Sequence, residues 1–256
     1  MEHQSAVTYG NNWNNWGGER AWTSKYYGIV DGLLFHETSH EWWGNSVTAI
    51  DPAHMWIHEG MAVYSEAMFI EDQLGYNVMI DFLLDKRKGI RNRRPIVGPS
   101  HQNYWAFGDS YNKGAWVLHT LRNIINNDDQ WFSILKEFSI ENAKSHVSTQ
   151  DFLNHITKTT KKDFQSIFNQ YFYDHRPPTF EYYQVGNKYY YRWSNVISGF
   201  TMPVDIDVNG VEMRLFPTEL LQSIDIAKHS TIYTRDWESY IILKEDSGII
   251  KNLNGE

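Results

Sequence analysis

Two histidines four residues apart, with one glutamate between them and another nineteen residues later, constrain this chain more than any other feature. They are His36, Glu37, His40 and Glu59. On a helix, side chains four positions apart project from the same face, one turn apart. Both imidazoles can therefore bind one zinc ion, and a glutamate from a second helix can supply the third ligand. Three protein ligands leave the fourth position open, which is typical of a catalytic zinc site rather than a structural one.

The glutamate inside the motif is expected to have a different role. One step along a helix turns the side chain by about 100°, so Glu37 cannot share the ligand direction of the two histidines. We expect it to act as a general base that takes a proton from a water molecule and passes it to the leaving amine. A free carboxylate could also be another ligand. The motif alone also fits a surface helix that carries two histidines and a solvated glutamate.

The sequence around the motif resembles the M1 family of zinc aminopeptidases, the gluzincins related to aminopeptidase N and leukotriene A4 hydrolase. Four blocks carry the resemblance in the order of the family, and the second glutamate follows at the family's spacing. The blocks are residues 1–4 (MEHQ), 35–48 (FHETSHEWWGNSVT), 56–62 (WIHEGMA) and 111–115 (YNKGA). Together they cover residues 1 to about 122, and the rest of the chain matches more loosely.

The resemblance implies that His36, His40 and Glu59 hold one zinc ion and that Glu37 is the base. It also implies that Tyr111 donates a hydrogen bond to the oxyanion of the tetrahedral intermediate. Without the resemblance, Tyr111 would be read as one of 16 tyrosines in an aromatic-rich core.

The first block concerns the substrate. Glu2 would pair with the free α-ammonium group of a peptide, which limits cleavage to one residue from the N-terminus. The alternative is a solvated side chain at a frayed terminus. His3 and Gln4 follow Glu2 where the family pattern, usually written G-x-M-E-N, continues with asparagine. The upstream glycine is also missing, so we expect a chain truncated at its N-terminus that lacks the upstream domains of its parent.

The function that these residues predict is a zinc-dependent aminopeptidase that acts on peptides with a free N-terminus. The alternatives are a zinc endopeptidase, a glycyl aminopeptidase of the M61 type, and a non-catalytic gluzincin-like scaffold or inactive fragment. An epoxide hydrolase activity is not required by any residue. Intact metal and base positions argue against a scaffold, whereas truncation argues for inactivity of this piece.

Composition narrows the choice of partners. Of the 256 residues, 41% are hydrophobic and 16% aromatic, which is enough for a large core. The net charge of −8 argues against nucleic acid. The sequence contains no run of eighteen apolar residues, so it predicts no membrane-spanning helix. The chain has no cysteine, so disulfides are excluded. The compartment stays unassigned, with a periplasmic or secreted location slightly favoured over the cytoplasm.

Helical periodicity and turn signals predict two domains. Residues 1–176 should form a mainly helical, thermolysin-like zincin catalytic domain without most of its N-terminal sheet, and residues 177–256 a small antiparallel β-sandwich. We expect helices at 25–43, from 51–52 to 74, and at 77–88, 111–126, 129–141, 149–158 and 162–173. We expect strands at 180–185, 189–193, 204–208, 211–216 and 240–244, with a two-residue hairpin turn at Asn209 and Gly210.

Four further features have open interpretations. Glu66 lies seven residues after Glu59 and could orient a metal ligand, with surface or core pairing an equal alternative. His54 and His58 are expected to be ordinary helix residues. The basic residues between 86 and 94 predict a solvated loop in preference to an anion site.

Overall fold

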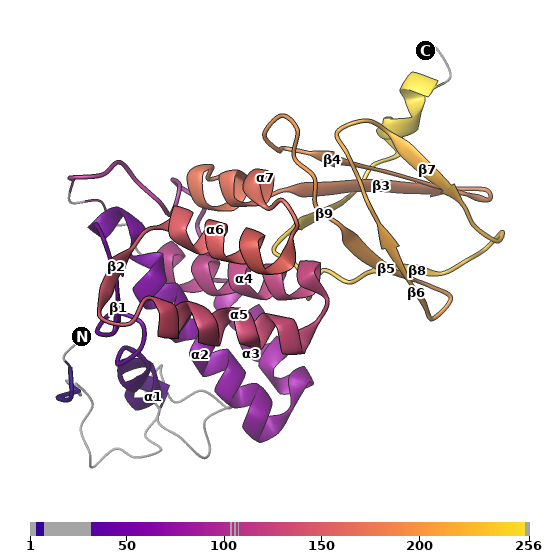
Figure 1. Cartoon of the computed structure of the whole chain (residues 1–256). Helices are drawn as coiled ribbons and strands as arrows, with labels where there is room; N and C mark the ends of the chain where they lie inside the picture. The colour runs from indigo at the N-terminus through magenta and orange to yellow at the C-terminus, as the bar shows by residue number, and fades with distance from the viewer. Residues whose placement is uncertain (1–3, 8–31, 103, 105, 107, 254–256) are drawn as a thin grey trace. The chain divides into compact units, whose positions relative to one another are not determined.

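The computed structural model describes residues 4–7, 32–102, 104, 106 and 108–253, with side chains described up to residue 250 (Figure 1). By their internal contacts these residues form two compact units. The first comprises Met1–Arg91 and Ile96–Lys162, and the second Asn92–Pro95 and Asp163–Glu256. The domain division predicted after residue 176 stays a prediction. Among the described helices, none has the length and apolarity needed to cross a membrane.

The first unit is mainly helical, as its periodicity predicts, and two three-residue strands pair in parallel beside the helices (Figure 1). In chain order its elements are α1 (Gly32–Ser39), β1 (Val47–Ala49), a 3₁₀ turn (Pro52–His54), α2 (Trp56–Leu74), α3 (Tyr76–Arg87), α4 (Gly108–Ile125), α5 (Asp128–Glu141), β2 (Ser145–Val147) and α6 (Thr149–Thr160).

The helices begin where their capping residues are. Asp51 caps the 3₁₀ turn by accepting a hydrogen bond from the Ala53 amide at 2.8 Å. Asn127 caps α5 in the same way. At the start of α6, Ser148 and Asp151 form a capping box in which each side chain accepts a hydrogen bond from the other residue's amide. The predicted bounds of α3 to α6 lie within three residues of the observed ones, whereas α2 begins four residues after the predicted start at residue 52.

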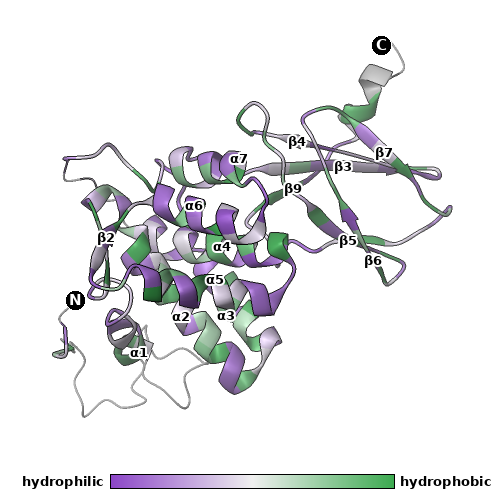
Figure 2. Ribbon diagram, in the orientation of Figure 1, coloured by the Kyte–Doolittle hydropathy of each residue, from purple (hydrophilic) through white to green (hydrophobic). Residues whose placement is uncertain are grey.

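The core of the first unit is built around α2 and α4. Twelve of the nineteen residues of α2 are buried, and so are fourteen of the eighteen in α4. Amphipathic helices cover this pair: Figure 2 shows hydrophobic and hydrophilic residues mixed along α6, whose Phe152 and Ile156 are buried while Asn154 is exposed. A helix buried on nearly every side, such as α2, is fixed in position by all of its neighbours.

The helix that carries the first histidine is shorter at its C-terminus than expected. The predicted end at residue 43 is wrong, because α1 ends at Ser39 and His40 lies in the turn that follows. The backbone there changes its hydrogen bonding: the Trp43 amide bonds to Ser39, whereas the Asn45 amide reaches back to His40. Gly44 then takes a φ of +132°. The start of this helix, predicted at residue 25, lies outside the described residues.

The second unit contains a short helix, α7 (Gln165–Phe168), a π-helical turn at Asn169–Tyr173, seven strands and a C-terminal 3₁₀ helix. The single helix predicted at 162–173 is therefore shorter and irregular. The strands form one sheet of order β7-β4-β3-β9 and another of order β6-β5-β8. Their bounds are β3 (Thr179–Val185), β4 (Lys188–Ser194), β5 (Val204–Val208), β6 (Val211–Leu215), β7 (Gln222–Asp225), β8 (Ile232–Thr234) and β9 (Ile242–Glu245).

The predicted turn between β5 and β6 is confirmed. Val208 pairs with Val211, and the two residues between them, Asn209 and Gly210, have φ values of +54° and +82°. Positive φ at both positions is the requirement of a type I′ hairpin turn.

The expectation of wholly antiparallel sheets is wrong at one pair, because β3 and β9 run parallel. Hairpins force antiparallel pairing, but five strands separate β3 from β9 along the chain, so no hairpin fixes their direction. The prediction lacks β1 and β2 in the first unit and β7 and β8 in this one. All four strands are at most four residues long, and β7 and β8 contain no buried residue that would indicate an inward face.

Candidate metal centre

The structure brings His36, His40 and Glu59 together in the first unit. Each can offer one ligand atom such that all three atoms lie within 4.8 Å of one another, and all three residues are buried. Glu59 Oε2 lies 3.2 Å from His36 Nε2 and 3.6 Å from His40 Nε2. The histidines come from α1 and the turn after it, and the glutamate comes from the first turn of α2.

The hydrogen bonds of the two rings fix which nitrogen faces Glu59. His36 Nδ1 lies 2.8 Å from Glu66 Oε1, and His40 Nδ1 lies 2.8 Å from the backbone oxygen of Trp43. Carboxylate and carbonyl oxygens only accept, so each Nδ1 carries the proton and donates it. In the neutral form of each ring, Nε2 then carries the lone pair on the side that faces Glu59. Two imidazole lone pairs and one carboxylate oxygen form a donor set that suits a divalent transition metal.

The early end of α1 leaves the Trp43 carbonyl available to the His40 ring. If the helix continued to residue 43 and beyond, the Trp43 carbonyl would be available to a later helical amide. In the observed turn it instead accepts the hydrogen bond of the His40 ring. Such a partner fixes both the tautomer and the ring orientation of a metal-binding histidine.

The charges around His36 show that the site needs a positive charge. Burial disfavours the charged ring, but hydrogen bonds and charge interactions with Glu59 and Glu66 outweigh burial and raise the pKa of His36 from 6.5 to about 9. Lys86, on α3, approaches the other oxygen of Glu66 at 3.6 Å. A chain without metal would therefore hold a proton where two carboxylates and the His36 ring meet.

Glu66 and Lys86 extend the site beyond the predicted residues. Of the two interpretations of Glu66, the structure supports contact with a candidate ligand, because its carboxylate is buried against His36. Lys86 was assigned to a solvated loop, but it lies in the last turn of α3 with only 22% of its side chain exposed. No signal in the sequence distinguished it from the basic residues after it.

The remaining predicted site residues are Tyr111, Glu37 and Glu2. Tyr111, in the first turn of α4, stacks on His36 with ring centroids 6.0 Å apart and planes 14° apart. Glu37 lies on α1 and is half-buried. The structure therefore brings His36, His40, Glu59 and Tyr111 together, and Glu37 is the neighbour of His36 along α1. Glu2 lies outside the described residues.

His54 and His58, which are not expected to bind metal, connect the start of α2 to its neighbours. His58 Nε2 accepts a hydrogen bond from the Ala49 amide in β1 at 2.8 Å. His54 Nδ1 lies 2.9 Å from Thr149 Oγ1, which also accepts a hydrogen bond from the Trp56 indole. These bonds tie the start of α2 to β1 and α6, and so they fix the segment that carries Glu59.

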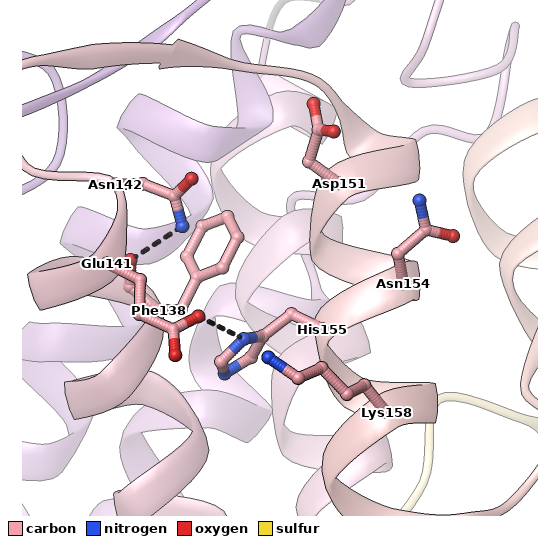
Figure 3. Close-up of a pocket in the computed structure, with 7 residues that line it drawn as sticks. All are labelled: Phe138, Glu141, Asn142, Asp151, Asn154, His155 and Lys158. Carbon is pink, nitrogen blue, oxygen red and sulfur yellow. Dashed lines mark hydrogen bonds and ion pairs between the residues drawn. The ribbon is translucent and has the colours of Figure 1, made fainter.

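A hollow of about 220 Å³ elsewhere in the first unit shares no residue with this cluster. It lies between α5 and α6, where Figure 3 shows the His155 ring beside Glu141. His155 Nε2 donates to the Ile134 backbone oxygen at 3.0 Å, and Asp151 belongs to the capping box. These polar groups hold the two helices together. The lining residues are Phe138, Glu141, Asn142, Asp151, Asn154, His155 and Lys158.

Comparison with known proteins identifies the family. Residues 1–171 match the peptidase family M1 domain, so this chain belongs to peptidase family M1. It is similar to human endoplasmic reticulum aminopeptidase 2, with 33% identity over 129 residues that cover 45% of this chain and 13% of the relative. It is also similar to bovine glutamyl aminopeptidase, with 30% identity over 132 residues that cover 45% of this chain and 14% of the relative. The resemblance inferred from the sequence is thus confirmed.

A solved structure supports the fold. The crystal structure of Legionella pneumophila aminopeptidase A in complex with aspartic acid matches 88% of this chain and 28% of that chain, with a TM-score of 0.63 and 20% identity. The mixed helical and β architecture is therefore shared with an aminopeptidase. The chain spans less than a third of the length of each of these relatives.

The charge on His36 predicts a pH dependence for the metal-free chain. A pKa raised from 6.5 to about 9 on folding adds stability that is complete below pH 6.5 and is lost as pH rises through 9. We expect the free energy of unfolding to fall by about 3 kcal/mol across this window. Urea unfolding at several pH values with a chelator present measures it. The same slope in a His36→Asn variant would contradict this assignment.

Proposed function

We propose that this chain is the metal-binding part of a zinc-dependent aminopeptidase that releases N-terminal residues from peptides. The observation that carries the proposal is the buried convergence of two histidine Nε2 atoms and one Glu59 oxygen within 4.8 Å. Membership of peptidase family M1 supports the reaction class, and the names of the similar proteins support cleavage at the N-terminus.

The donor set fits zinc. Two imidazole nitrogens and one carboxylate oxygen are ligands that zinc accepts in catalytic sites, where three protein ligands leave a position for water or substrate. Zinc bound by His36, His40 and Glu59 would lower the pKa of a water molecule and polarise the scissile carbonyl. Glu66 would keep the His36 ring oriented through its 2.8 Å hydrogen bond.

Proton transfer falls to Glu37 in this proposal. Its place on α1, between the two histidines in sequence, and its half-buried side chain suit a base beside the metal. A carboxylate there takes the proton from the attacking water and passes it to the leaving amine, because the amine is protonated as the carbon–nitrogen bond breaks.

Tyr111 would stabilise the negative charge that develops on the former carbonyl oxygen. Its ring lies next to His36, so its hydroxyl is carried on the side of α4 that faces the metal ligands. A neutral phenol can donate one hydrogen bond to an oxyanion, and a donor of this kind contributes most in the transition state. Glu2 is proposed to bind the substrate's α-ammonium group.

The experiment that tests the proposal is hydrolysis of a panel of aminoacyl fluorogenic amides and of their N-acetylated counterparts by the zinc-loaded chain. We expect cleavage of the free amides alone, abolished by a chelator and restored by zinc. Cleavage of both sets would replace the aminopeptidase with an endopeptidase. No cleavage by a folded, zinc-bound chain would favour a non-catalytic scaffold.

The role of Glu37 gives a separate prediction. Glu37→Gln should retain zinc but lower kcat by about 10²- to 10⁴-fold, because the amide cannot accept the proton. Steady-state kinetics and metal analysis measure the two effects. Asp81→Asn, an exposed substitution on α3, is the control and should leave both unchanged. Wild-type turnover in Glu37→Gln would exclude Glu37 as the base.

The contact between Glu66 and His36 predicts an effect on zinc affinity. Glu66→Gln keeps the side-chain size but removes the charge that orients the ring, so the Kd for zinc should rise by about 10- to 100-fold. Competition with a chromogenic chelator measures the Kd, and Glu137→Gln, exposed on α5, is the matched control. An unchanged Kd would mean that Glu66 serves packing alone.

A further inference from the structure

Two glycines on different helices meet with almost no space between their backbones. Gly60 on α2 and Gly114 on α4 face each other, and both lie inside their helices. A Cβ atom built on Gly114 would lie 2.9 Å from the Cα of Gly60, and one built on Gly60 would lie 3.0 Å from the Cα of Gly114. The obstacles are backbone atoms, which cannot rotate aside as a flexible side chain could. Any residue other than glycine must therefore push the helices apart.

The contact lies next to two residues of the candidate site. Gly60 directly follows Glu59, and Gly114 lies one helical turn after Tyr111, on the same face of α4. The Cβ built on Gly60 would also lie 3.0 Å from the backbone oxygen of Ser110, the residue before Tyr111. The two helices therefore touch where one carries a metal ligand and the other carries the phenol.

The ends of the contact are rigid, so a displacement could not be absorbed locally. On α2, the Trp56 indole and the His58 ring bond to Thr149 and to the Ala49 amide. On α4, the Trp116 indole donates to the Leu83 backbone oxygen in α3 at 2.7 Å. Because each helix is held by side-chain bonds within four residues of its glycine, separation at this point would move Tyr111 relative to Glu59.

We propose that the contact between Gly60 and Gly114 is a positioning element that sets the distance from the Tyr111 hydroxyl to the metal ligands. The proposal rests on the proposed function, in which Tyr111 donates to the developing oxyanion. It assigns to the glycines a role in transition-state stabilisation through Tyr111, in addition to close helix packing. A misplacement of about 1 Å in such a group can cost about 10²-fold in rate.

Gly114→Ala tests the proposal. We expect kcat on a free aminoacyl amide to fall by about 10- to 100-fold with little change in KM, and the zinc content to stay at one per chain. Affinity for a phosphinic dipeptide, whose tetrahedral phosphorus carries two oxygens, should fall by a similar factor in calorimetry. The matched control is Gly108→Ala in the same helix, where a Cβ would meet no atom within 4 Å.

A double-mutant cycle separates positioning from general damage. If Gly114→Ala acts through Tyr111, it should cost less than about 3-fold in a Tyr111→Phe background, because the hydroxyl it displaces is already gone. Additive losses would overturn the proposal. Gly60→Ala approaches the same contact from α2 and should behave in the same way. Loss of folding in both alanine variants, seen by circular dichroism, would also overturn it, since the contact would then serve stability alone.

Different outcomes would contradict the role of Tyr111 and the positioning role of the glycines. If Tyr111→Phe leaves kcat and phosphinic dipeptide affinity unchanged, the role of Tyr111 in the proposed function is wrong. If Tyr111→Phe lowers both but Gly114→Ala lowers neither, only the positioning role of the glycines is wrong.

Discussion

The buried negative charge of two glutamates is the constraint around which the helical unit is organised. Glu59 and Glu66 contact opposite nitrogens of the His36 ring, and both carboxylates are buried. A buried carboxylate is costly unless a cation or hydrogen-bond donors compensate it. Lys86 supplies one positive charge to Glu66, and the raised pKa of His36 supplies another when no metal is bound. A divalent cation bound as proposed would meet the demand better than a proton, because it would also engage His40.

Helix α2 carries both of the glutamates that contact the His36 ring. Seven residues make nearly two turns, so Glu59 and Glu66 lie on one face of α2 and reach the same ring. The candidate metal ligand Glu59 and the carboxylate of Glu66 that contacts the His36 ring are thus held by a single helix. The bonds of Trp56 and His58 hold the start of that helix. Sites on rigid elements keep their geometry more closely than sites on loops, which suits a site that must hold a metal.

The parts of this site that could be predicted from the sequence are those whose chemistry is visible over short spacings. His36 and His40 follow from metal-ligand spacing, because four residues make about one helical turn, and Glu59 follows from the nineteen-residue spacing of the family that the sequence resembles. Tyr111 could not be found this way, since neither spacing nor residue type separates it from the other tyrosines; only the family resemblance did.

The predictions that were wrong depend on contacts that no short sequence pattern reveals. The periodicity of α1 continues past Ser39, but the helix ends there and the Trp43 carbonyl bonds to a side chain, which no local pattern shows. Lys86 looked like its basic neighbours because its partner, Glu66, is twenty positions away. The parallel pairing of β3 with β9 likewise depends on a long connection rather than on a turn. Partners distant in sequence decided the last two outcomes, whereas the early end of α1 depends on a side-chain bond between residues three positions apart.

In the proposed mechanism, metal binding and transition-state stabilisation depend on different contacts of this molecule. The ligands and Glu66 belong to α1, α2 and the turn between α1 and β1, whereas Tyr111 belongs to α4. The close contact between Gly60 and Gly114 lies between the two groups and leaves no space for a methyl group. A chain that relaxed at this contact could keep its metal and still place the phenol too far from the reacting oxygen. Under this proposal, zinc content alone is a poor measure of catalytic competence, because it reports on only one of the two helix arrangements that the proposed catalysis requires.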